Sequence, residues 1–227
     1  MKAMMKSVCP ELTEEQLDKF SLFYDLLIDW NTRMNLTAIT DPEEVAKKHF
    51  KDSLQGSPYI PEGADCIDVG TGAGFPGIPL LICRPDIRMT LLDSLNKRLQ
   101  FLEEVTDKLD LKDRVKIIHT RAEDGGQDRE LREWYDICLT RAVASLPVLL
   151  ELTVPFVKNG GTSICYKGNA EEEILLATNA CRILRCELEE KDVSSDYGKR
   201  TLVLAKKKGK TPDQYPRKAG TPAKKPL

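Results

Sequence analysis

The stretch DVGTGAGFPGIP, residues 68–79, holds four glycines and two prolines directly after an apolar run. The run Cys66–Val69 has the composition of a buried strand, and residues 77–83 form an apolar segment that favours a helix. Glycines at positions 70, 72 and 74 would let the backbone of the turn approach a ligand closely. Such ligands bind at the carboxyl ends of parallel strands. The stretch therefore predicts a site for a nucleotide-like ligand between a strand and a helix.

The chain that follows this turn alternates between strand-like and helix-like segments. This alternation predicts a parallel sheet with helices on both faces. The last apolar run follows a less regular stretch (186–198), and the two could form a hairpin-like pair at the sheet edge. The strand-like runs are Cys66–Val69, Met89–Leu92, Val115–His119, Ile137–Thr140, Thr162–Tyr166 and Thr201–Ala205, and the helical candidates are 77–83, 95–109, 145–157 and 171–184.

Two further helices are predicted ahead of the sheet. Thr13 to Gln16 fits a capping box before an apolar repeat, which predicts a helix over 14–34. Pro42 suits the first turn of a second helix, which should run to about Leu54. We therefore expect a helical cap over residues 1–55, a single α/β domain over 56–206 and a basic, flexible tail over 207–227.

The charge of the chain is unevenly distributed. The formal net charge is -2, yet the segment from Lys206 to the end holds eight Lys or Arg and one acid, which leaves the rest of the chain acidic. A basic segment rich in Pro and Gly is typical of an arm that contacts RNA phosphates. It is equally typical of a solvated tail without a partner, and the charge alone leaves both interpretations open.

Composition excludes several classes of protein. The 227 residues are 41% apolar, which suits a soluble domain with a substantial core. No apolar run approaches the ~20 residues that span a bilayer, and the first residues lack the apolar segment of a signal peptide. We therefore expect a cytoplasmic protein with no membrane contact. The seven cysteines form no C-x-x-C pair and there are two histidines, so no metal site is expected.

The glycine turn also satisfies G-x-G-x-x-G, at 72–77, and Asp93 follows about 20 residues later, as in nucleotide-dependent oxidoreductases. Three features favour S-adenosylmethionine instead. Asp68 at the strand end suits a cationic ligand, and Pro76 lacks an N–H that a pyrophosphate would need. The acids in residues 121–124 could accept a hydrogen bond from an adenine amino group. Asp93 could bind the ribose hydroxyls of either ligand.

The fourth strand-like run ends in Thr140-Arg141-Ala142, which bears on the methyl acceptor. The N/D-P-P-Y/F motif of exocyclic-amine methylation is missing, as is the Pro-Cys or Thr-Cys of carbon-5 pyrimidine methylation, and we expect Cys138 to point into the core. Guanine N7 is a candidate acceptor, because it has a lone pair and no proton to lose, and so needs no general base. Arg141 would then either pair with an active-site carboxylate or contact an anionic or carbonyl group of the substrate or cofactor.

Seven segments together resemble one known family, and they cover nearly the whole chain in order. The resemblance is to RsmG, formerly GidB, the bacterial methyltransferase acting on guanine N7 in 16S ribosomal RNA of the small subunit. The segments are NLTAI (35–39), HFKDSL (49–54), DVGTGAGFPGIPL (68–80), LLDSLNKRLQFL (91–102), RAED (121–124), TRAVASL (140–146) and YPRKAGTPAKKPL (215–227).

The resemblance implies a Rossmann-like class I methyltransferase fold, with a mostly parallel seven-stranded sheet and an N-terminal helical extension. It implies S-adenosylmethionine as the cofactor and 16S ribosomal RNA, within the small subunit, as the partner; we expect the enzyme itself to be a monomer. Arg141 is the candidate catalytic residue, through positioning of the substrate or cofactor. The expected cofactor-binding residues are Gly70, Phe75, Ala122, Glu123 and Arg141, with Asp68 at the cationic end of the ligand and Asp93 at its ribose.

The roles of several polar residues stay open. His49 and Asp52, in HFKDSL, could serve the core or a helix cap, or could line the substrate entrance. Lys167 and Arg200 stand next to strand ends, where solvated surface and phosphate contact are both plausible. Two other functions also stay open from the residues: a nucleotide-dependent oxidoreductase, and a noncatalytic RNA-binding factor of ribosome assembly.

Overall fold

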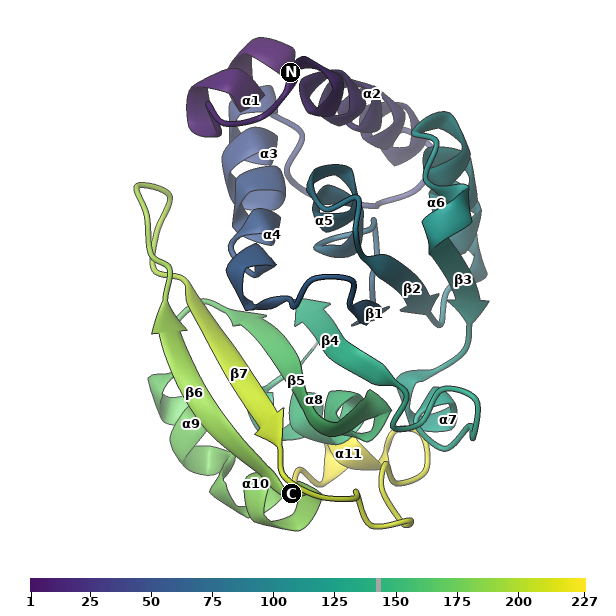
Figure 1. Ribbon diagram of the computed structural model, residues 1–227, viewed down its shortest axis with the longest axis vertical. Coiled ribbons are helices and arrows are strands. Elements are labelled where there is room, and N and C mark those ends of the chain that lie inside the picture. The colour runs from purple at the N-terminus through teal and green to yellow at the C-terminus, as the bar shows by residue number, and fades with distance from the viewer. Residues whose placement is uncertain (142–143) are drawn as a thin grey trace.

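Seven strands form one sheet in the order β3-β2-β1-β4-β5-β7-β6 (Figure 1). The computed structural model of the protein describes residues 1–141 and 144–227. Within that part, β7 runs antiparallel to both of its neighbours, and the other strand pairs are parallel. This confirms the mostly parallel sheet. The strands are β1 (Asp65–Val69), β2 (Arg88–Asp93), β3 (Val115–His119), β4 (Tyr135–Arg141), β5 (Val157–Lys167), β6 (Cys186–Asp192) and β7 (Thr201–Lys207).

The strand β6 is the element that the sequence left irregular. Its letters, CELEEKD, are mostly charged, yet it pairs with β7 along its whole length. It lies at the edge of the sheet, so Cys186 and Leu188 suffice to pack on the core while the charged side chains face solvent. Glu189 pairs across to Lys206 on β7 at 2.5 Å. This confirms the hairpin-like pair at the sheet edge that was expected between residues 186–198 and the last apolar run.

Alternating side chains of the strands divide the core between the two faces of the sheet. Cys66 and Leu139 face the first layer, whereas Ile67 and Cys138 face the second. The first layer holds α5 (Gly77–Cys83) and α6 (Asn96–Lys108); the second holds α7 (Ala122–Gly125), α8 (Leu146–Thr153), α9 (Glu171–Leu176) and α10 (Thr178–Leu184). Short 3-10 turns are η2 (Ser57–Tyr59), η3 (Lys112–Arg114) and η4 (Val154–Phe156). Among the described residues, no helix is both long enough and apolar enough to cross a membrane.

The N-terminal segment forms a helical cap over the first layer (Figure 1). The capping box at Thr13 is present, with its side chain and that of Gln16 each bonded to the other's backbone N–H. The expected helix from Pro42 to Leu54 is also present, but its middle is a π-helix. The elements are α1 (Lys2–Val8), α2 (Glu14–Asn31), α3 (Pro42–Val45), the π-helix η1 (Ala46–Lys51) and α4 (Asp52–Leu54).

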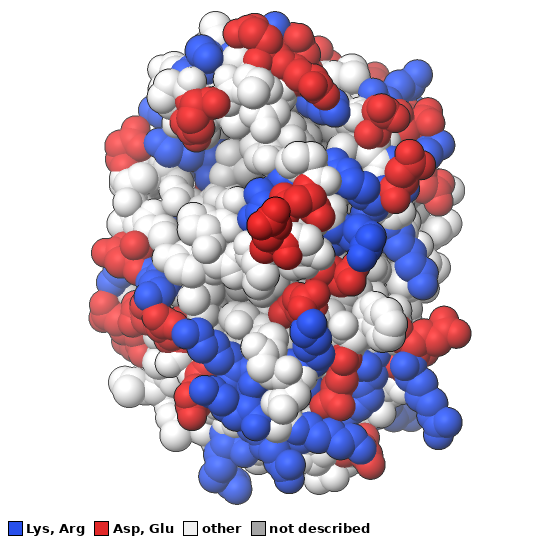
Figure 2. Space-filling model, viewed as in Figure 1, with Lys and Arg blue, Asp and Glu red and all other residues white. Residues whose placement is uncertain are grey.

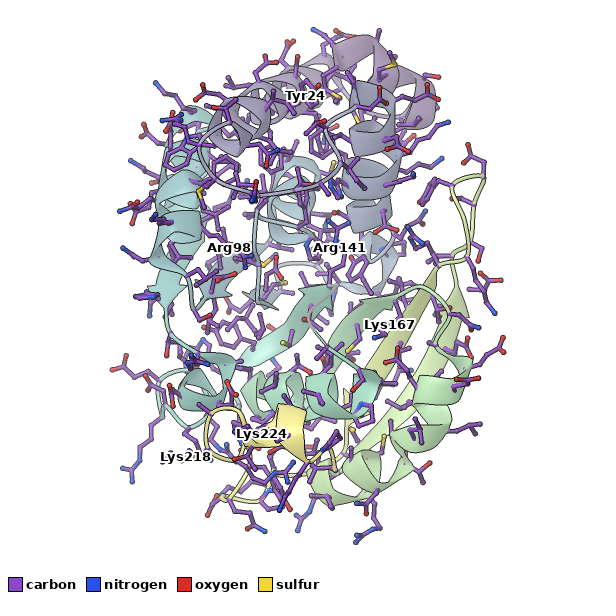
Figure 3. The ribbon with its side chains drawn as sticks, turned by 180° about the vertical axis from the view of Figure 1, so that it is seen from behind. Tyr24, Arg98, Arg141, Lys167, Lys218 and Lys224 are labelled. Carbon is purple, nitrogen blue, oxygen red and sulfur yellow. The ribbon has the colours of Figure 1, made fainter. Side chains whose placement is uncertain are left out.

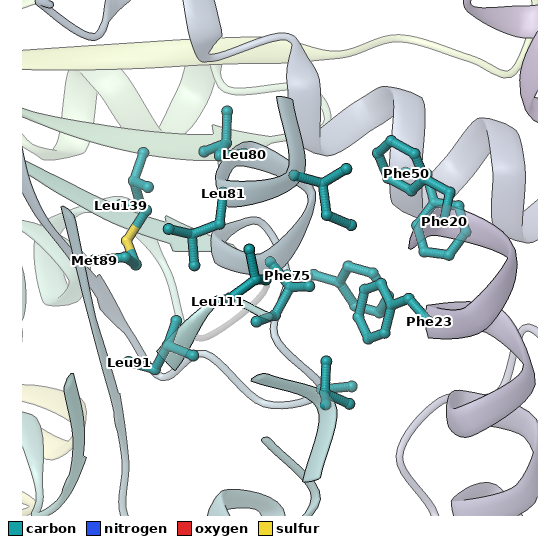
Figure 4. Close-up of a cluster of buried hydrophobic side chains, with 14 of the residues drawn as sticks. Phe20, Phe23, Phe50, Phe75, Leu80, Leu81, Met89, Leu91, Leu111 and Leu139 are labelled. Atoms are coloured by element: carbon teal, nitrogen blue, oxygen red, sulfur yellow. The ribbon is translucent and has the colours of Figure 1, made fainter. Parts of the chain in front are cut away.

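An aromatic cluster joins this cap to the sheet (Figure 4). Phe20 and Phe23 of α2 pack on Phe50 of η1, with ring centroids 5.0 and 5.4 Å apart. Phe23 also lies 5.4 Å from Phe75, which belongs to the glycine turn. These rings are part of one buried cluster that continues to the strands. The cap thus shares its core with the sheet, and residue 55 does not separate two cores.

The segment 208–227, here called the C-terminal strap, differs from the flexible tail predicted from its composition. It lies against α7 and α8 and ends in the short helix α11 (Thr221–Lys224) (Figure 1). The guanidinium of Arg132 donates to the carbonyls of Thr211, Pro212 and Tyr215. Arg217 pairs with the fully buried carboxylate of Glu151 at 2.5 Å. Composition could not predict this packing, because the partners of the strap are groups on distant parts of the fold.

Candidate active site

In the glycine turn between β1 and α5, backbone N–H groups donate hydrogen bonds to acceptors within the protein. The N–H groups of Gly70 and Thr71 donate to the carbonyl of Leu92, at 2.9 and 3.1 Å. The N–H of Gly72 donates to the carboxylate of Asp93 at 3.0 Å. A turn that holds a pyrophosphate must instead present such groups to its ligand. This geometry therefore disfavours a dinucleotide at the turn. It adds to the sequence argument that Pro76 has no N–H to offer a pyrophosphate.

The glycines of the turn serve two purposes. Gly70 and Gly72, with φ of 71° and 60°, line a cavity at the end of β1, as expected for close approach of a ligand. Gly74 faces the core instead. A Cβ at that position would stand 2.6 Å from Ile78 and 2.9 Å from Leu102. Close approach to a ligand thus explains the first two glycines, and helix packing explains the third.

The cavity at this turn, here called the first cavity, has a volume of about 460 Å³. It lies at the carboxyl ends of β1, β2 and β4, where ligands of open parallel sheets bind. Six of the seven predicted site residues line it: Gly70, Phe75, Asp93, Ala122, Glu123 and Arg141. Other lining residues, which sequence reasoning did not single out as ligand contacts, include Thr37, Arg98 and Thr120.

Asp68 is the exception, because its side chain does not line the first cavity, and its contact with the ligand stays a prediction. Its side chain is fully buried beneath the turn, on the side of the sheet that faces α5. One carboxylate oxygen accepts from the hydroxyl of Thr71 at 2.8 Å and from the N–H of Gly77 at 2.9 Å. Burial raises the pKa of Asp68 to about 6. The alternation of β1 sends this side chain inward, so it holds the turn in shape.

The two acids that line the first cavity are both oriented by backbone amides. Asp93, at the end of β2, accepts from the N–H groups of Leu95 and Gly72. A carboxylate has about four acceptor positions, so capacity remains for ligand hydroxyls. Glu123, in the first turn of α7, accepts from the N–H of Gly220 at 2.9 Å. That contact comes from the C-terminal strap, which therefore reaches the wall of the cavity.

Arg141, the last residue of β4, forms an ion pair with the carboxylate of Asp52. An ion pair with a carboxylate of the site was one of its two predicted roles. Its Nη1 lies 3.0 Å from Asp52 Oδ2 and 3.2 Å from the Lys48 carbonyl oxygen. Its guanidinium carbon lies 5.0 Å from the ring centroid of Phe75. The guanidinium is thereby fixed over the cavity wall. Ala142, the next residue of the motif, lies outside the described residues.

His49 lies between the helical cap and the glycine turn and lines the first cavity. Its ring stacks on Phe75, with centroids 4.7 Å apart, and its Nε2 lies 2.8 Å from the Thr37 hydroxyl. Burial, together with the charge of Arg141, lowers the pKa of His49 to about 4, so the ring is neutral near pH 7. The π-helix is a form often found at functional sites. The segments NLTAI and HFKDSL were the only sequence signal for this contact.

A second cavity, of about 490 Å³, adjoins the first through His49 and Arg141, which line both. Figure 3 shows Arg141 between Arg98, which lines the first cavity, and Lys167, which lines the second. The other residues that line the second cavity are Ile39, Lys48, Asp52, Tyr166, Gly168, Asn169, Glu173, Val193, Arg200, Thr201 and Leu202.

Cys138 takes no part in either cavity. Its side chain is fully buried on the second face of the sheet, as the sequence predicted. Burial raises the pKa of this thiol well above its ordinary value, which keeps it protonated. A protonated, buried thiol is a poor nucleophile. Covalent methylation of a pyrimidine through this residue is therefore disfavoured.

Solved structures share this fold. An O-methyltransferase from Bacillus cereus in complex with SAH aligns with a TM-score of 0.58 and 17% identity, covering 82% of this chain and 90% of that one. The [4+2]-cyclase SpnF aligns with a TM-score of 0.57 and 14% identity, covering 73% and 82%. At these identities the likeness establishes the fold alone, and the second example shows that the fold hosts other reactions.

Sequence relatives are far closer. Ribosomal RNA small subunit methyltransferase G of Acetivibrio thermocellus is 50% identical over 220 residues, which cover 95% of this chain and 90% of the relative. The protein of the same name from Alkaliphilus metalliredigens is 49% identical, covering 100% and 98%. The model of the family GidB, rRNA small subunit methyltransferase G, matches residues 16–203. The chain therefore belongs to the GidB family of rRNA small subunit methyltransferases G.

Proposed function

We propose that this protein transfers a methyl group from S-adenosylmethionine to N7 of a guanine in 16S ribosomal RNA of the small subunit. Methyl transfer is the reaction for which its family is named. The observation that carries the proposal furthest is the first cavity. It combines a turn with internally bonded amides, two oriented carboxylates and a fixed arginine, at the edge of a sheet where ligands bind.

The residues of the first cavity fit S-adenosylmethionine. Asp93 has acceptor capacity for ribose hydroxyls, and Glu123 offers a carboxylate to an adenine amino group. Gly70 and Gly72 leave room for a ligand at the turn, and Phe75 walls the pocket with an aromatic face. When bound, this cofactor supplies an activated methyl group on a sulfonium. The amides of Gly70, Thr71 and Gly72 are bonded within the protein, which matches a cofactor without phosphate at this turn.

The acceptor chemistry needs little from side chains beyond placement. The N7 lone pair would accept the methyl group that the cofactor supplies, and the thioether left behind would be the second product. No proton leaves N7, so no general base is required. Positioning of the two reactants and exclusion of water then supply most of the rate. Arg141 would hold the base or the cofactor, and neutral His49 would close the pocket without adding a charge near the sulfonium.

Incorporation of labelled methyl into small subunits that lack the modification tests the proposal. We expect label in 16S RNA, and mapping of the modified base should place it at guanine N7. An intact protein that binds S-adenosylhomocysteine yet transfers no label would favour the noncatalytic assembly factor. Calorimetric binding of NAD(P), with none of S-adenosylhomocysteine, would favour the oxidoreductase and overturn the proposal.

The same proposal places the protein with its substrate in the cytoplasm, as a monomer bound to the small subunit. The exposed lysines of the strap and β7 support a polyanionic partner. They gather at the lower end of the face in Figure 2, where the strap lies in Figure 1. They are Lys206, Lys208, Lys210, Lys218, Lys224 and Lys225. Sedimentation of the free protein, and of its mixture with subunits, tests both the monomer and the partner.

A further inference from the structure

The second cavity lies next to the first, where a second reactant could bind beside the cofactor. It lies at the carboxyl ends of β4 and β5 and at the start of β7, on the same edge of the sheet as the first cavity. Arg141 and His49 line both cavities, so a group bound in one meets a group bound in the other across these two side chains. Two ligands that react with each other need this kind of adjacency.

The charges of the two cavities differ. The second cavity is lined by four cations against two carboxylates, Asp52 and Glu173. The first is lined by three cations, also against two carboxylates, Asp93 and Glu123. The cations of the second cavity are Lys48, Arg141, Lys167 and Arg200. Lys48 pairs with Glu44, and Lys167 pairs with Glu173. Asp52 alone faces both Arg141 and Arg200, so one positive charge stays unbalanced there, which favours an anionic group of the ligand.

The second cavity also offers apolar surface to a flat ligand. Ile39, Val193 and Leu202 contribute aliphatic groups, and Tyr166 contributes a ring whose position is fixed by a bond from its hydroxyl to the Ser53 carbonyl at 2.8 Å. An aromatic base needs apolar contact on its faces, with polar groups at its edges and at the attached phosphates. This cavity presents both kinds of lining.

Asp52 organises the cationic wall. Its carboxylate is 5% exposed, and each oxygen holds one arginine: Oδ2 lies 3.0 Å from Nη1 of Arg141, and Oδ1 lies 3.0 Å from Nε of Arg200. The three residues come from α4, from β4 and from the residue just before β7. Such a carboxylate fixes two guanidinium groups that would otherwise repel each other and move apart.

We propose that the second cavity receives the target purine nucleotide of the RNA, with its phosphate at Arg200 and its base toward Arg141, and that Asp52 is the positioning residue for both arginines. This inference rests on the proposed function and adds the place where the acceptor binds. Arg141 stands at the junction of the cavities, where it can contact the base while N7 remains open to the methyl group. Arg200 is 30% exposed and faces the outer part of the cavity, where the RNA backbone enters.

The test compares Arg200→Ala, Asp52→Asn and the control Arg182→Ala, an exposed arginine on α10 that lines neither cavity. For Arg200→Ala we expect KM for small subunits to rise about tenfold with kcat nearly unchanged, as for the loss of one hydrogen bond to a charged group. The slope of log affinity against log salt should also become shallower by about 0.7–0.9, because one phosphate contact is lost. Affinity for S-adenosylhomocysteine should stay at the wild-type value.

Asp52→Asn keeps the shape of the side chain and removes its charge. We expect a lower kcat together with a higher KM, because both arginines lose their anchor. A general loss of structure would also lower the free energy of unfolding, which should stay near the wild-type value in this variant. The control should match the wild type in every readout. An unchanged KM and salt slope in Arg200→Ala would overturn the inference, as would a parallel loss of affinity for S-adenosylhomocysteine.

Direct binding of small subunits, in the presence of S-adenosylhomocysteine, separates this inference from the proposed function. If the wild type transfers no methyl group, the proposed function fails, and binding alone then decides the role of the cavity. Weaker binding by Arg200→Ala than by Arg182→Ala would support the second cavity as the RNA site. Equal binding by the two variants would exclude it.

Discussion

The two ends of the chain both fold onto the body of the protein, but different forces hold them. The N-terminal cap is held by apolar burial: Phe20, Phe23 and Phe50 are fully buried, and the last two pack on Phe75 of the glycine turn. The C-terminal strap packs Tyr215 and Leu227 against the second layer. It is also held by directed polar bonds, above all from Arg132 and from the pair Arg217–Glu151. Each end also supplies a wall contact of the first cavity.

This difference has a consequence for how each end responds to change. Apolar packing is non-directional and is lost in proportion to the volume removed. A directed bond to a buried group is lost in one step, and its former partner is then left unsatisfied. The cap should therefore resist small changes in shape, whereas the strap should detach when single polar groups are removed.

The largest effect is expected from Phe23→Ala. The ring contacts Phe50, Phe75 and Phe101, so its removal leaves a cavity at the junction of cap and sheet. We expect the free energy of unfolding to fall by about 3–5 kcal/mol. Chemical denaturation measures this, with Leu22→Ala, a partly exposed neighbour on α2, as the control. Equal losses in the two variants would contradict a tightly packed junction.

A smaller effect is expected from Arg132→Ala. Its guanidinium accounts for bonds to three carbonyls of the strap, which would be left without this donor. We expect a loss of about 1–3 kcal/mol and, more specifically, faster proteolysis within residues 208–227. Arg129→Ala, an exposed arginine of the same loop, is the control. A strap that stays protected in Arg132→Ala would show that other contacts hold it.

A still smaller and more local effect is expected from Gly220→Ala. This glycine has φ of 80°, and its N–H donates to Glu123 on the wall of the first cavity. An alanine strains the backbone by roughly 1 kcal/mol, so Glu123 should lose orientation and affinity for S-adenosylhomocysteine should drop.

Gly63→Ala provides the matched control, because Gly63 has φ of 68°, open space around it and no contact with either cavity. It should lose similar stability and keep the wild-type affinity. If the two variants bind S-adenosylhomocysteine equally well, the strap does not influence the first cavity.

The smallest effect on stability is expected from Lys218→Ala combined with Lys224→Ala. Both side chains are exposed, and Figure 3 shows them on the strap, below Arg141 and Lys167 in that view. Stability should change by less than about 0.5 kcal/mol, while affinity for small subunits should fall most at low salt. Charge removal is a cleaner test than truncation of the strap, which would also strip Glu123 and Glu151 of their partners. An unchanged salt slope would exclude phosphate contact by these lysines.

Much of the fold could be predicted from local pattern. Alternating apolar runs located six strands, and the capping box with its apolar repeat located α2, because both signals depend on residues close together in the chain. The glycine turn was likewise predicted with its cavity. The pairing of β6 with β7 was expected as an edge pair, because the two segments are neighbours in the chain. The ordered strap escaped, since its polar partners are distant in sequence.

At the site, the residue types at the ends of β1, β2 and β4 could be read from the sequence, and segments spread along the chain identified the family. The directions of those side chains follow from the way the elements pack in three dimensions. This packing turned Asp68 inward, brought His49 onto Phe75 and joined Asp52 to two arginines. The physical reason is that spacing along a strand fixes the face of a side chain, whereas its partners depend on how separate elements pack.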